Sequence, residues 1–547
     1  MIPPRASMRL LALLAVLGCA SPDASRTATL VVATSAEPSS LLPMFVTETQ
    51  GRAVSEQLFD RLSEIGPGLN TVGDAGFAPR LAERWEWSAD SLRIAFHLDP
   101  RARWHDGQPV RAIDVQRALQ LVKDSRTTAP QASDFGAIDS ISVTDSLTAT
   151  AWFSRRSPQQ FYLAGYLLFP VPAHAIAGIA PDSLRTSAFA RAPIGSGPFT
   201  LVSWLPQDRI ELRAVADHYR GAPTLGRVVW QYASEASVSV RRLFAGEADF
   251  METLSPPDVA ELAKYPEVRA VGYPSFDYTL LAFNARDPVR HTQPHPLFGD
   301  RALRRALTMA VDRQQLARAL FDSLGAPGLG PFVRAQAFAD TTIPAIPFDV
   351  VAARATLDSL GWRLGANDSI RTRGGKRLAW STLVPASSKN RQKAALILQA
   401  AFKAVGAEMT IEGLDFAGFL ARQDARRFDA AIVGWRPNAG AVSLPQTWGR
   451  AGLRPGGNNL ASYASDTFDA AVDSGVNALS PVEQRRLLRR AFETIIADAP
   501  AIWLYEPRNV AGAHRRVAVP ALRPDAWWAD LSRWTVAARL PRDTVTR

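Results

Sequence analysis

The sequence predicts an α/β protein with more than one domain, and three patterns support this prediction. Residues 82–98 alternate apolar and polar side chains, which is the period of half-buried strands. Residues 301–311 repeat apolar side chains every three or four positions, which is the period of an amphipathic helix. The run "DAAIVGW" at 429–435 is apolar enough to form a buried strand. A length of 547 residues leaves room for two or more domains.

The N-terminal elements follow from the same rules. Residues 30–33 are apolar and predict a first core strand, and residues 37–45 are rich in turn formers and predict a loop. Residues 52–62 carry apolar side chains at helical spacing and predict a helix that ends near Leu62.

The stretch from Pro79 to Val115 predicts strand, turn, strand, turn and helix in order. The two strands are joined by a turn at 88–91. Asp106-Gly107 is a turn dipeptide, and Asp114 lies near the start of an apolar run with helical spacing.

Further elements continue this mixture along the chain. Gly195, Gly197 and Pro198 predict a tight turn before a strand at 199–204; no helix with Lys-Ser/Thr follows them, so the pattern does not indicate a phosphate-binding loop. Asp300 is a candidate N-cap for the helix that follows it. The remaining expected elements are strands within 140–153, at 429–435 and at 501–505, and helices at 159–168, 349–362, 393–402 and 481–498.

The N-terminus and the single cysteine indicate export. Arg5 and Arg9 precede a short apolar run, 10–17, which ends at Gly18-Cys19-Ala20. The run is too short to span a bilayer, which needs about 20 residues. "VLGC" at 16–19 resembles a bacterial lipobox, which implies a lipoprotein signal peptide over 1–18, lipidation of Cys19 and a tether over 19–28. A plain secretory signal with an incidental cysteine is the alternative. One cysteine excludes a disulfide within the chain.

The charge pattern and the motifs argue against nucleic-acid binding and against catalysis. The net charge is +10, but the basic residues are scattered, without a basic tail, so no nucleic-acid partner is expected. His105-Asp106 is a weak candidate for a catalytic pair beside its turn role, since no nucleophile motif accompanies it. His291 and His295 have the spacing of two metal ligands, but the prolines beside His295 predict a loop. We therefore expect no enzyme, no catalytic residue, no metal and no cofactor.

The stretch 79–115 resembles the signature region of the bacterial extracellular solute-binding proteins of family 5, the oligopeptide, dipeptide and nickel receptors of ABC importers. Three later regions, 193–249, 280–332 and 501–505, resemble further motifs of this family, so the resemblance covers about 28–535. The matching residues of the signature are Pro79, Leu81, Ala82, Trp85, Ser88, Asp90, Phe96, His97, Leu98, 104–107, Pro109, Ala112, Asp114 and Val115.

The resemblance implies a two-lobed periplasmic-binding-protein clamp (class II, cluster C-like) with an inserted subdomain in the first lobe. Lobe I is expected at 29–54, 186–275 and 508–547, the inserted subdomain at 55–185 and lobe II at 278–505, with hinge crossings near 271–277 and 505–510. The implied function is to capture a peptide-like solute and deliver it to the ABC permease. The implied setting is a monomer in the periplasm or cell envelope, held at the membrane by its lipid anchor.

The resemblance also implies where the solute binds. The family places an acidic residue shortly after a Gly-Trp pair, where it binds the α-ammonium of a peptide. Here that position holds Asn438, beside Trp435 and Arg436. An amide does not neutralise a desolvated ammonium, so a blocked peptide, a neutral or anionic solute, or an acid elsewhere is required. A shift of register and a plain loop role for Asn438 are the other readings.

Further candidates for contacts with the solute are Asn284 at the lobe boundary, Arg391 and Lys393 as carboxylate binders, and Phe45, Trp448 and Tyr505 as aromatic walls. Core packing is the alternative for these aromatic residues and for Trp435.

Three alternatives remain open at this point. Within the binding class, the solute is a nickel chelate, a haem or an oligosaccharide. In another class, the chain is an exported hydrolase. In a third, it is a signalling receptor built on the same clamp.

Overall fold

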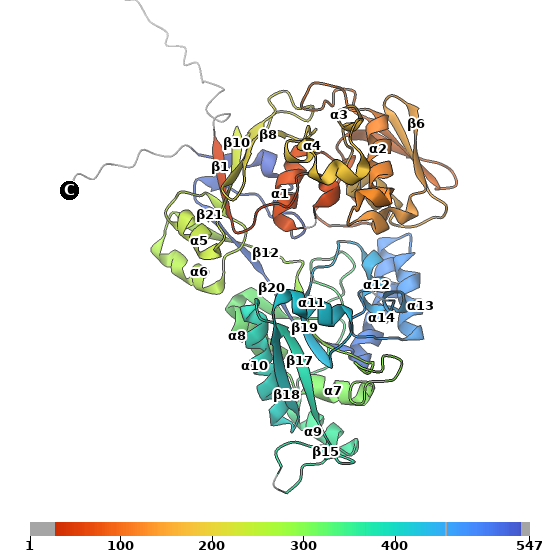
Figure 1. Ribbon diagram of the computed structural model, residues 1–547, viewed down its shortest axis with the longest axis vertical. Coiled ribbons are helices and arrows are strands. Elements are labelled where there is room, and N and C mark those ends of the chain that lie inside the picture. Colours follow the sequence, from red (N-terminus) through yellow and green to blue (C-terminus); the bar gives the residue numbers. More distant parts are fainter. Residues whose placement is uncertain (1–27, 47, 367, 455–456, 538–547) are drawn as a thin grey trace, which may run out of the picture.

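The computed structural model describes residues 28–46, 48–366, 368–454 and 457–537 (Figure 1). The expected signal peptide and Cys19 lie outside the described residues, as does most of the tether. Two large sheets and one smaller sheet organise the chain. Figure 1 shows the first third of the chain and the elements from α7 to α14 in two separate halves. No described helix is long and apolar enough to cross a membrane.

The first large sheet has seven strands and collects segments from both ends of the chain. The expected strand at 30–33 is confirmed as β1 (Thr29–Thr34), whose Leu30 and Val32 are buried. It lies parallel between β10 and β11, and β21 brings residues near 510 beside them. The order is β12 (Val268–Tyr273), β21 (Asn509–His514), β11 (Phe250–Met251), β1, β10 (Arg227–Tyr232), β9 (Arg209–Ala214) and β8 (Phe199–Leu205).

The second large sheet has six strands and helices on both faces. Along β13, Leu281 packs with the helices α7, α8 and α10, whereas Leu280 faces the other way, toward α13 and α14. The alternation of side chains along a strand explains this division. The order is β14 (Gly325–Pro327), β20 (Ala501–Pro507), β13 (Tyr278–Phe283), β19 (Ala430–Trp435), β17 (Ala379–Pro385) and β18 (Glu408–Leu414). The helices are α7 (Arg301–Met309), α8 (Arg313–Phe321), α9 (Val350–Ser359), α10 (Lys389–Ala404), α11 (Phe416–Asp424), α12 (Leu444–Trp448), α13 (Asp466–Val476) and α14 (Pro481–Asp498).

The smaller sheet and its helix confirm the element order expected for 79–115. β4 (Ala82–Trp87) and β5 (Arg93–Leu98) pair antiparallel, and β7 (Thr148–Trp152) and β6 (Ser140–Asp145) complete the sheet. In α2 (Ala112–Lys123), Asp114 accepts hydrogen bonds from Trp104 Nε1 (3.0 Å), Arg111 N (2.8 Å) and Ala173 N (2.9 Å). This signature aspartate therefore caps the helix and fixes the preceding turn.

Two of the expected helices differ from the structure. The helix expected at 52–62 is α1 (Thr49–Leu58), which ends four residues early. The reason is tertiary: Leu58 O accepts a hydrogen bond from Gly197 N (2.8 Å), and Asp60 N donates to Ser196 Oγ (3.2 Å), so residues after Leu58 pair with a distant loop. The segment expected as an α-helix at 159–168 winds as a π-helix over Tyr162–Leu167.

The remaining short elements connect these layers. They are the strands β2 (Ser63–Ile65), β3 (Phe77–Pro79), β15 (Thr372–Arg373), β16 (Lys376–Arg377), β22 (Val517–Ala518) and β23 (Thr535–Val536), and the helices α3 (Ala173–Ile176), α4 (Ala188–Arg191), α5 (Ala236–Phe244) and α6 (Pro256–Glu261). A 3-10 helix at Ala132–Ala137 precedes β6.

The chain passes between the two large sheets at two short connections. β12 belongs to the seven-stranded sheet and β13 to the six-stranded sheet, and residues 274–277 join them. β20 and β21 make the return crossing through Arg508.

A buried aspartate makes the stability of this fold depend on acid pH. Asp60 bonds Tyr219 Oη (2.8 Å) and pairs with Arg220 (2.8 Å) and His218 (3.3 Å). Burial opposes ionisation, yet Arg220 and His218 hold the pKa of Asp60 well below its ordinary value. An acid whose folded pKa is lowered stabilises the protein above the unfolded pKa, about 3.9, and this contribution is lost as the pH falls toward the folded pKa.

We expect Asp60→Asn to lower the free energy of unfolding by about 1.5–3 kcal/mol at pH 7, which is the strength of hydrogen bonds to a charged group. The difference from the wild type should shrink as the pH falls below about 4. Urea unfolding at pH 7 and pH 3 measures both values. The exposed carboxylate Asp139 supplies a control, Asp139→Asn, which should change stability little at either pH. An Asp60→Asn deficit that stays equal at both pH values would contradict the assignment.

Candidate functional site

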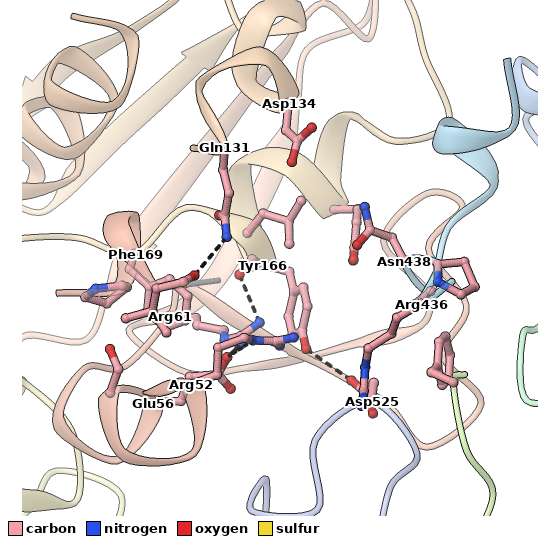
Figure 2. A pocket seen from close by; sticks show the side chains of 18 residues that line it. Arg52, Glu56, Arg61, Gln131, Asp134, Tyr166, Phe169, Arg436, Asn438 and Asp525 are labelled. Atoms are coloured by element: carbon pink, nitrogen blue, oxygen red, sulfur yellow. Dashed lines mark hydrogen bonds and ion pairs between the residues drawn. The ribbon is translucent and has the colours of Figure 1, made fainter. Parts of the chain in front are cut away.

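A cavity of about 330 Å³ lies where the two halves of the chain face each other (Figure 2). One wall comes from α1, the segment 131–134, the π-helix and Asp525, and the other comes from the loop 436–439 that follows β19. Phe276, in the crossing between β12 and β13, also lines it. The full lining is Pro43, Val46, Arg52, Ser55, Glu56, Arg61, Gln131, Asp134, Tyr162, Tyr166, Leu167, Phe169, Phe276, Arg436, Pro437, Asn438, Ala439 and Asp525.

A paired charge group forms the floor of the cavity. Glu56 lies between Arg52 (3.0 Å) and Arg61 (2.6 Å) and accepts a hydrogen bond from Trp528 Nε1 (2.8 Å). Burial favours the neutral acid, but the two arginines together hold the pKa of Glu56 below its ordinary value. These three side chains therefore carry their charges while satisfying one another.

Aromatic side chains from the π-helix form a second wall. Tyr162 and Tyr166 lie four positions apart in the π-helix and stack with their ring centroids 5.3 Å apart. The Arg61 guanidinium lies 3.9 Å from the Tyr166 ring centroid, which is a cation–π contact. Tyr166 Oη donates to Asp525 (3.4 Å), and burial raises the pKa of Tyr166 to about 12. The wall thus offers apolar ring faces with the hydroxyl of Tyr166 already engaged.

Two sequence-predicted residues lie in the cavity wall of the second half. Arg436 pairs with Asp277 (3.2 Å) in the crossing segment. Asn438 is exposed at the cavity, and its backbone carbonyl accepts a hydrogen bond from Gln336 Nε2 (2.7 Å). Trp435 and Trp448 lie next to this loop but line a much smaller cavity of about 10 Å³.

The other predicted site residues lie outside the cavity. Arg391 is half-buried against the backbone of Gly434, and Lys393 is exposed on α10. Burial lowers the pKa of Arg391, while the nearby Tyr505 and Asp277 oppose that shift. Tyr505 is buried in the core of the second half. A carboxylate-binding role for Arg391 and Lys393 stays a prediction.

Asn284 and Phe45 do not line the cavity, and their side chains contact other parts of the protein. Asn284 is fully buried, and its Nδ2 donates to the carbonyls of Arg426 (3.2 Å) and Phe428 (3.0 Å). Phe45 packs in the core of the first half beneath Arg185, 4.6 Å from its ring centroid. Neither side chain is positioned to contact a solute in this conformation.

Sequence reasoning missed most of the cavity. Arg52 and Glu56 share one face of α1 at a spacing of four, and this polar pair within an apolar helix was an available signal. Asp134, Tyr166 and Asp525 had no such signal, since they come from segments far apart in the chain.

The histidines have structural partners as well. His105 accepts a hydrogen bond from Gly195 N at Nδ1 (3.2 Å), and its Nε2 lies 3.0 Å from Gly197 O, so it fixes the glycine turn. Asp106 pairs with His174 (2.7 Å) and His295 with Asp429 (3.1 Å). Among the described residues, no group of three or more histidine, cysteine or acidic side chains is arranged to hold a metal ion.

The model of the bacterial extracellular solute-binding proteins, family 5, matches residues 76–448. The chain belongs to this family. The match spans the inserted sheet, the crossing at 274–277 and the loop 436–439 at the cavity. The family membership and the two-lobed fold expected from the sequence are therefore confirmed.

The similarity to individual relatives and solved structures extends over most of this chain. Protein XP55 of Streptomyces lividans is 28% identical over 86% of this chain and 81% of its own length. The oligopeptide-binding protein AppA of Bacillus subtilis is 20% identical over 93% of this chain and 91% of its own. The solved structure of AppA with a nonapeptide has a TM-score of 0.76, at 94% and 99% coverage. NikZ of Campylobacter jejuni with Ni(L-His) also has a TM-score of 0.76 at 20% identity, covering 93% and 99%.

Proposed function

We propose that this protein is the substrate-binding receptor of an ABC importer, which captures a peptide-like solute between its two lobes and delivers it to the permease. The observation that supports this most is the cavity lined from both halves of the chain. Buried charges and tyrosine faces are the features that fix a small polar solute in a pocket. AppA, a relative along almost the full chain, binds oligopeptides and so favours this solute class.

We propose a hinged closure for this receptor. Lobe I comprises 29–54, 186–275 and the segment from 508, with 55–185 inserted, and lobe II comprises 278–505. The two crossings at 274–277 and Arg508 are short enough to act as a hinge, since a few residues absorb such motions. Phe276, Asp277 and Arg436 connect the crossing directly to the cavity wall, so the solute would contact the hinge itself.

We propose that the protein works outside the cytoplasm, in the periplasm or cell envelope, as a lipid-anchored monomer. The family is one of extracellular proteins, and the lipobox-like sequence at Cys19 supports the anchor. Labelling cells with a fatty-acid probe tests this: wild-type protein should incorporate the lipid, and Cys19→Ser should not. Equal labelling of both would overturn the anchor.

A solute screen on stripped protein tests the peptide assignment. The chain from residue 21 onward is unfolded in denaturant to release bound solute and refolded, and recovery is checked by circular dichroism. We expect short peptides to raise the midpoint of thermal unfolding, because a ligand that binds only the native state stabilises it by mass action. Stabilisation by nickel–histidine, haem or oligosaccharides without any by peptides would overturn the proposal.

The same samples test the enzymatic alternative. A receptor returns its peptides intact, so mass spectrometry after long incubation should recover the added peptides unchanged. Their cleavage, with loss of that cleavage in His105→Ala, would favour the exported hydrolase.

A further inference from the structure

One charged side chain in the cavity wall stands apart from the others. Each of Arg52, Glu56 and Arg61 has an ion-pair partner, Asp525 pairs with Arg523 (2.6 Å), and Arg436 pairs with Asp277. Asp134 lines the same cavity, and no side chain in the described part of the chain bonds or pairs with its carboxylate.

Within the described part of the chain, side chains of the cavity wall offer oxygen atoms in addition to those of Asp134, and no cation perturbs its carboxylate. Gln131 lies one turn before it and donates its Nε2 to Val46 O (3.4 Å), which leaves the amide oxygen for another partner. Asn438 reaches the cavity from the opposite half of the chain. Figure 2 shows the Asp134 carboxylate directed into the cavity from one side and Asn438 on another. Carboxylate and amide oxygens together suit a hydrogen-bond donor with positive charge.

The ion pairs of the cavity point the same way. Each arginine that lines it has an ion-pair partner, since Arg52 and Arg61 share Glu56 and Arg436 pairs with Asp277, so an anionic solute would have to compete with these pairs in the described wall. Among the charged side chains of the described lining, Asp134 alone has no ion-pair partner. A solute that carries a cationic group at this end completes the pairing when the lobes close.

We propose that Asp134 is the residue that binds the cationic group of the solute, the free α-ammonium of a short peptide, from the inserted subdomain. This inference rests on the proposed function and deepens it. It also explains Asn438: the acid that the family places in the loop after Gly-Trp is replaced here by one on the facing wall. The cavity of about 330 Å³ is at the lower end of small-molecule pockets, ~300–1,000 Å³, which favours a short peptide.

Because Asp134 has no ion-pair partner in the described lining, replacing it should affect protein stability and solute binding differently. Partial desolvation on the cavity wall raises the pKa of Asp134, and no cation among the described residues counters this shift, although the residue as a whole stays exposed to solvent. An acid whose folded pKa is raised destabilises the folded protein when ionised, and stability is regained as the pH falls through that pKa. Because Asp134 is exposed to solvent on the cavity wall, this penalty is small, and Asp134→Asn should leave the unfolding midpoint of the solute-free protein unchanged or slightly higher while it weakens binding. A residue with a purely structural role would not separate the two measurements in this direction.

The test compares a tripeptide mixture having free N-termini with the same mixture N-acetylated. Isothermal titration and thermal shift are measured on stripped wild type, Asp134→Asn, Asp134→Glu and Asp139→Asn. We expect wild type and Asp139→Asn to prefer the free-amine mixture by about tenfold or more, which is the worth of a charge-assisted hydrogen bond. Asp134→Asn should lose this preference, and Asp134→Glu should retain part of it. The preference of the wild type should also decline as the pH falls and Asp134 takes up a proton.

The outcomes separate this inference from the proposed function. If wild type binds both mixtures equally, or if Asp134→Asn keeps the full preference, Asp134 does not bind the ammonium although the receptor still takes peptides. If neither mixture binds while another solute class does, the proposed function fails and this inference fails with it.

Discussion

Replacing Arg523 with methionine is expected to lower the free energy of unfolding by about 3–5 kcal/mol, which is typical when one partner of a buried ion pair is removed. Arg523 joins two segments distant in sequence: it pairs with Glu64 (2.7 Å) and donates to Ile65 O (3.0 Å) in one, and it pairs with Asp525 (2.6 Å) in its own. Methionine fills the space but leaves two carboxylates without this cation. Urea unfolding at pH 7 measures the loss.

The control for this variant is an arginine of the same segment that faces solvent. The side chain of Arg533 is 82% exposed and lies 3.9 Å from Asp530. Arg533→Met should change stability by no more than about 0.5 kcal/mol. A loss below about 1 kcal/mol for Arg523→Met would show that Glu64 and Asp525 find other partners.

Replacing Gly195 with alanine is expected to cost about 3 kcal/mol or more, or to abolish the folded yield. A Cβ at this position would lie 1.8 Å from Leu58 O and 3.0 Å from His105 Cε1. The glycine is required here for space, because two stretches of backbone approach closely where α1 ends. The urea midpoint, or the soluble yield after export where no folded protein is recovered, measures the effect.

A glycine without near neighbours separates this crowding from a general effect of the added methyl group. Nothing lies within 4 Å of a Cβ built at Gly178. Gly178→Ala should therefore stay within about 0.5 kcal/mol of the wild type. Equal losses for Gly178→Ala and Gly195→Ala would contradict the crowding explanation.

Local patterns in the sequence predict those elements whose cause is local. The alternation over 82–98 marks β4 and β5, and Asp300 caps α7 by accepting hydrogen bonds from Ala302 N (2.9 Å) and Leu303 N (3.3 Å). The end of α1 could not be predicted in this way. Leu58 is followed by residues with helical spacing, and only contact with the loop at 195–197 shows why the helix stops.

The residues that line the cavity are even harder to predict from local sequence patterns. Arg436 and Asn438 could be located, because they follow a recognisable buried strand by a few residues. Asp134 and Asp525 share the cavity although almost four hundred residues separate them. Neither has a neighbouring motif that marks it, so their meeting is a property of the folded chain.

The position of β21 and of the segment around Arg523 near the C-terminal end of the sequence affects when the first lobe can fold. β1 leaves the ribosome first, yet its sheet is completed by β21, and the cavity wall by Asp525. Contacts of such long sequence separation form late and slowly. The first lobe therefore stays incomplete until nearly the whole polypeptide has been made. Under the export proposed above, this delay would keep the chain open for translocation, and a truncated product would emerge without the part of the cavity wall that contains Asp525.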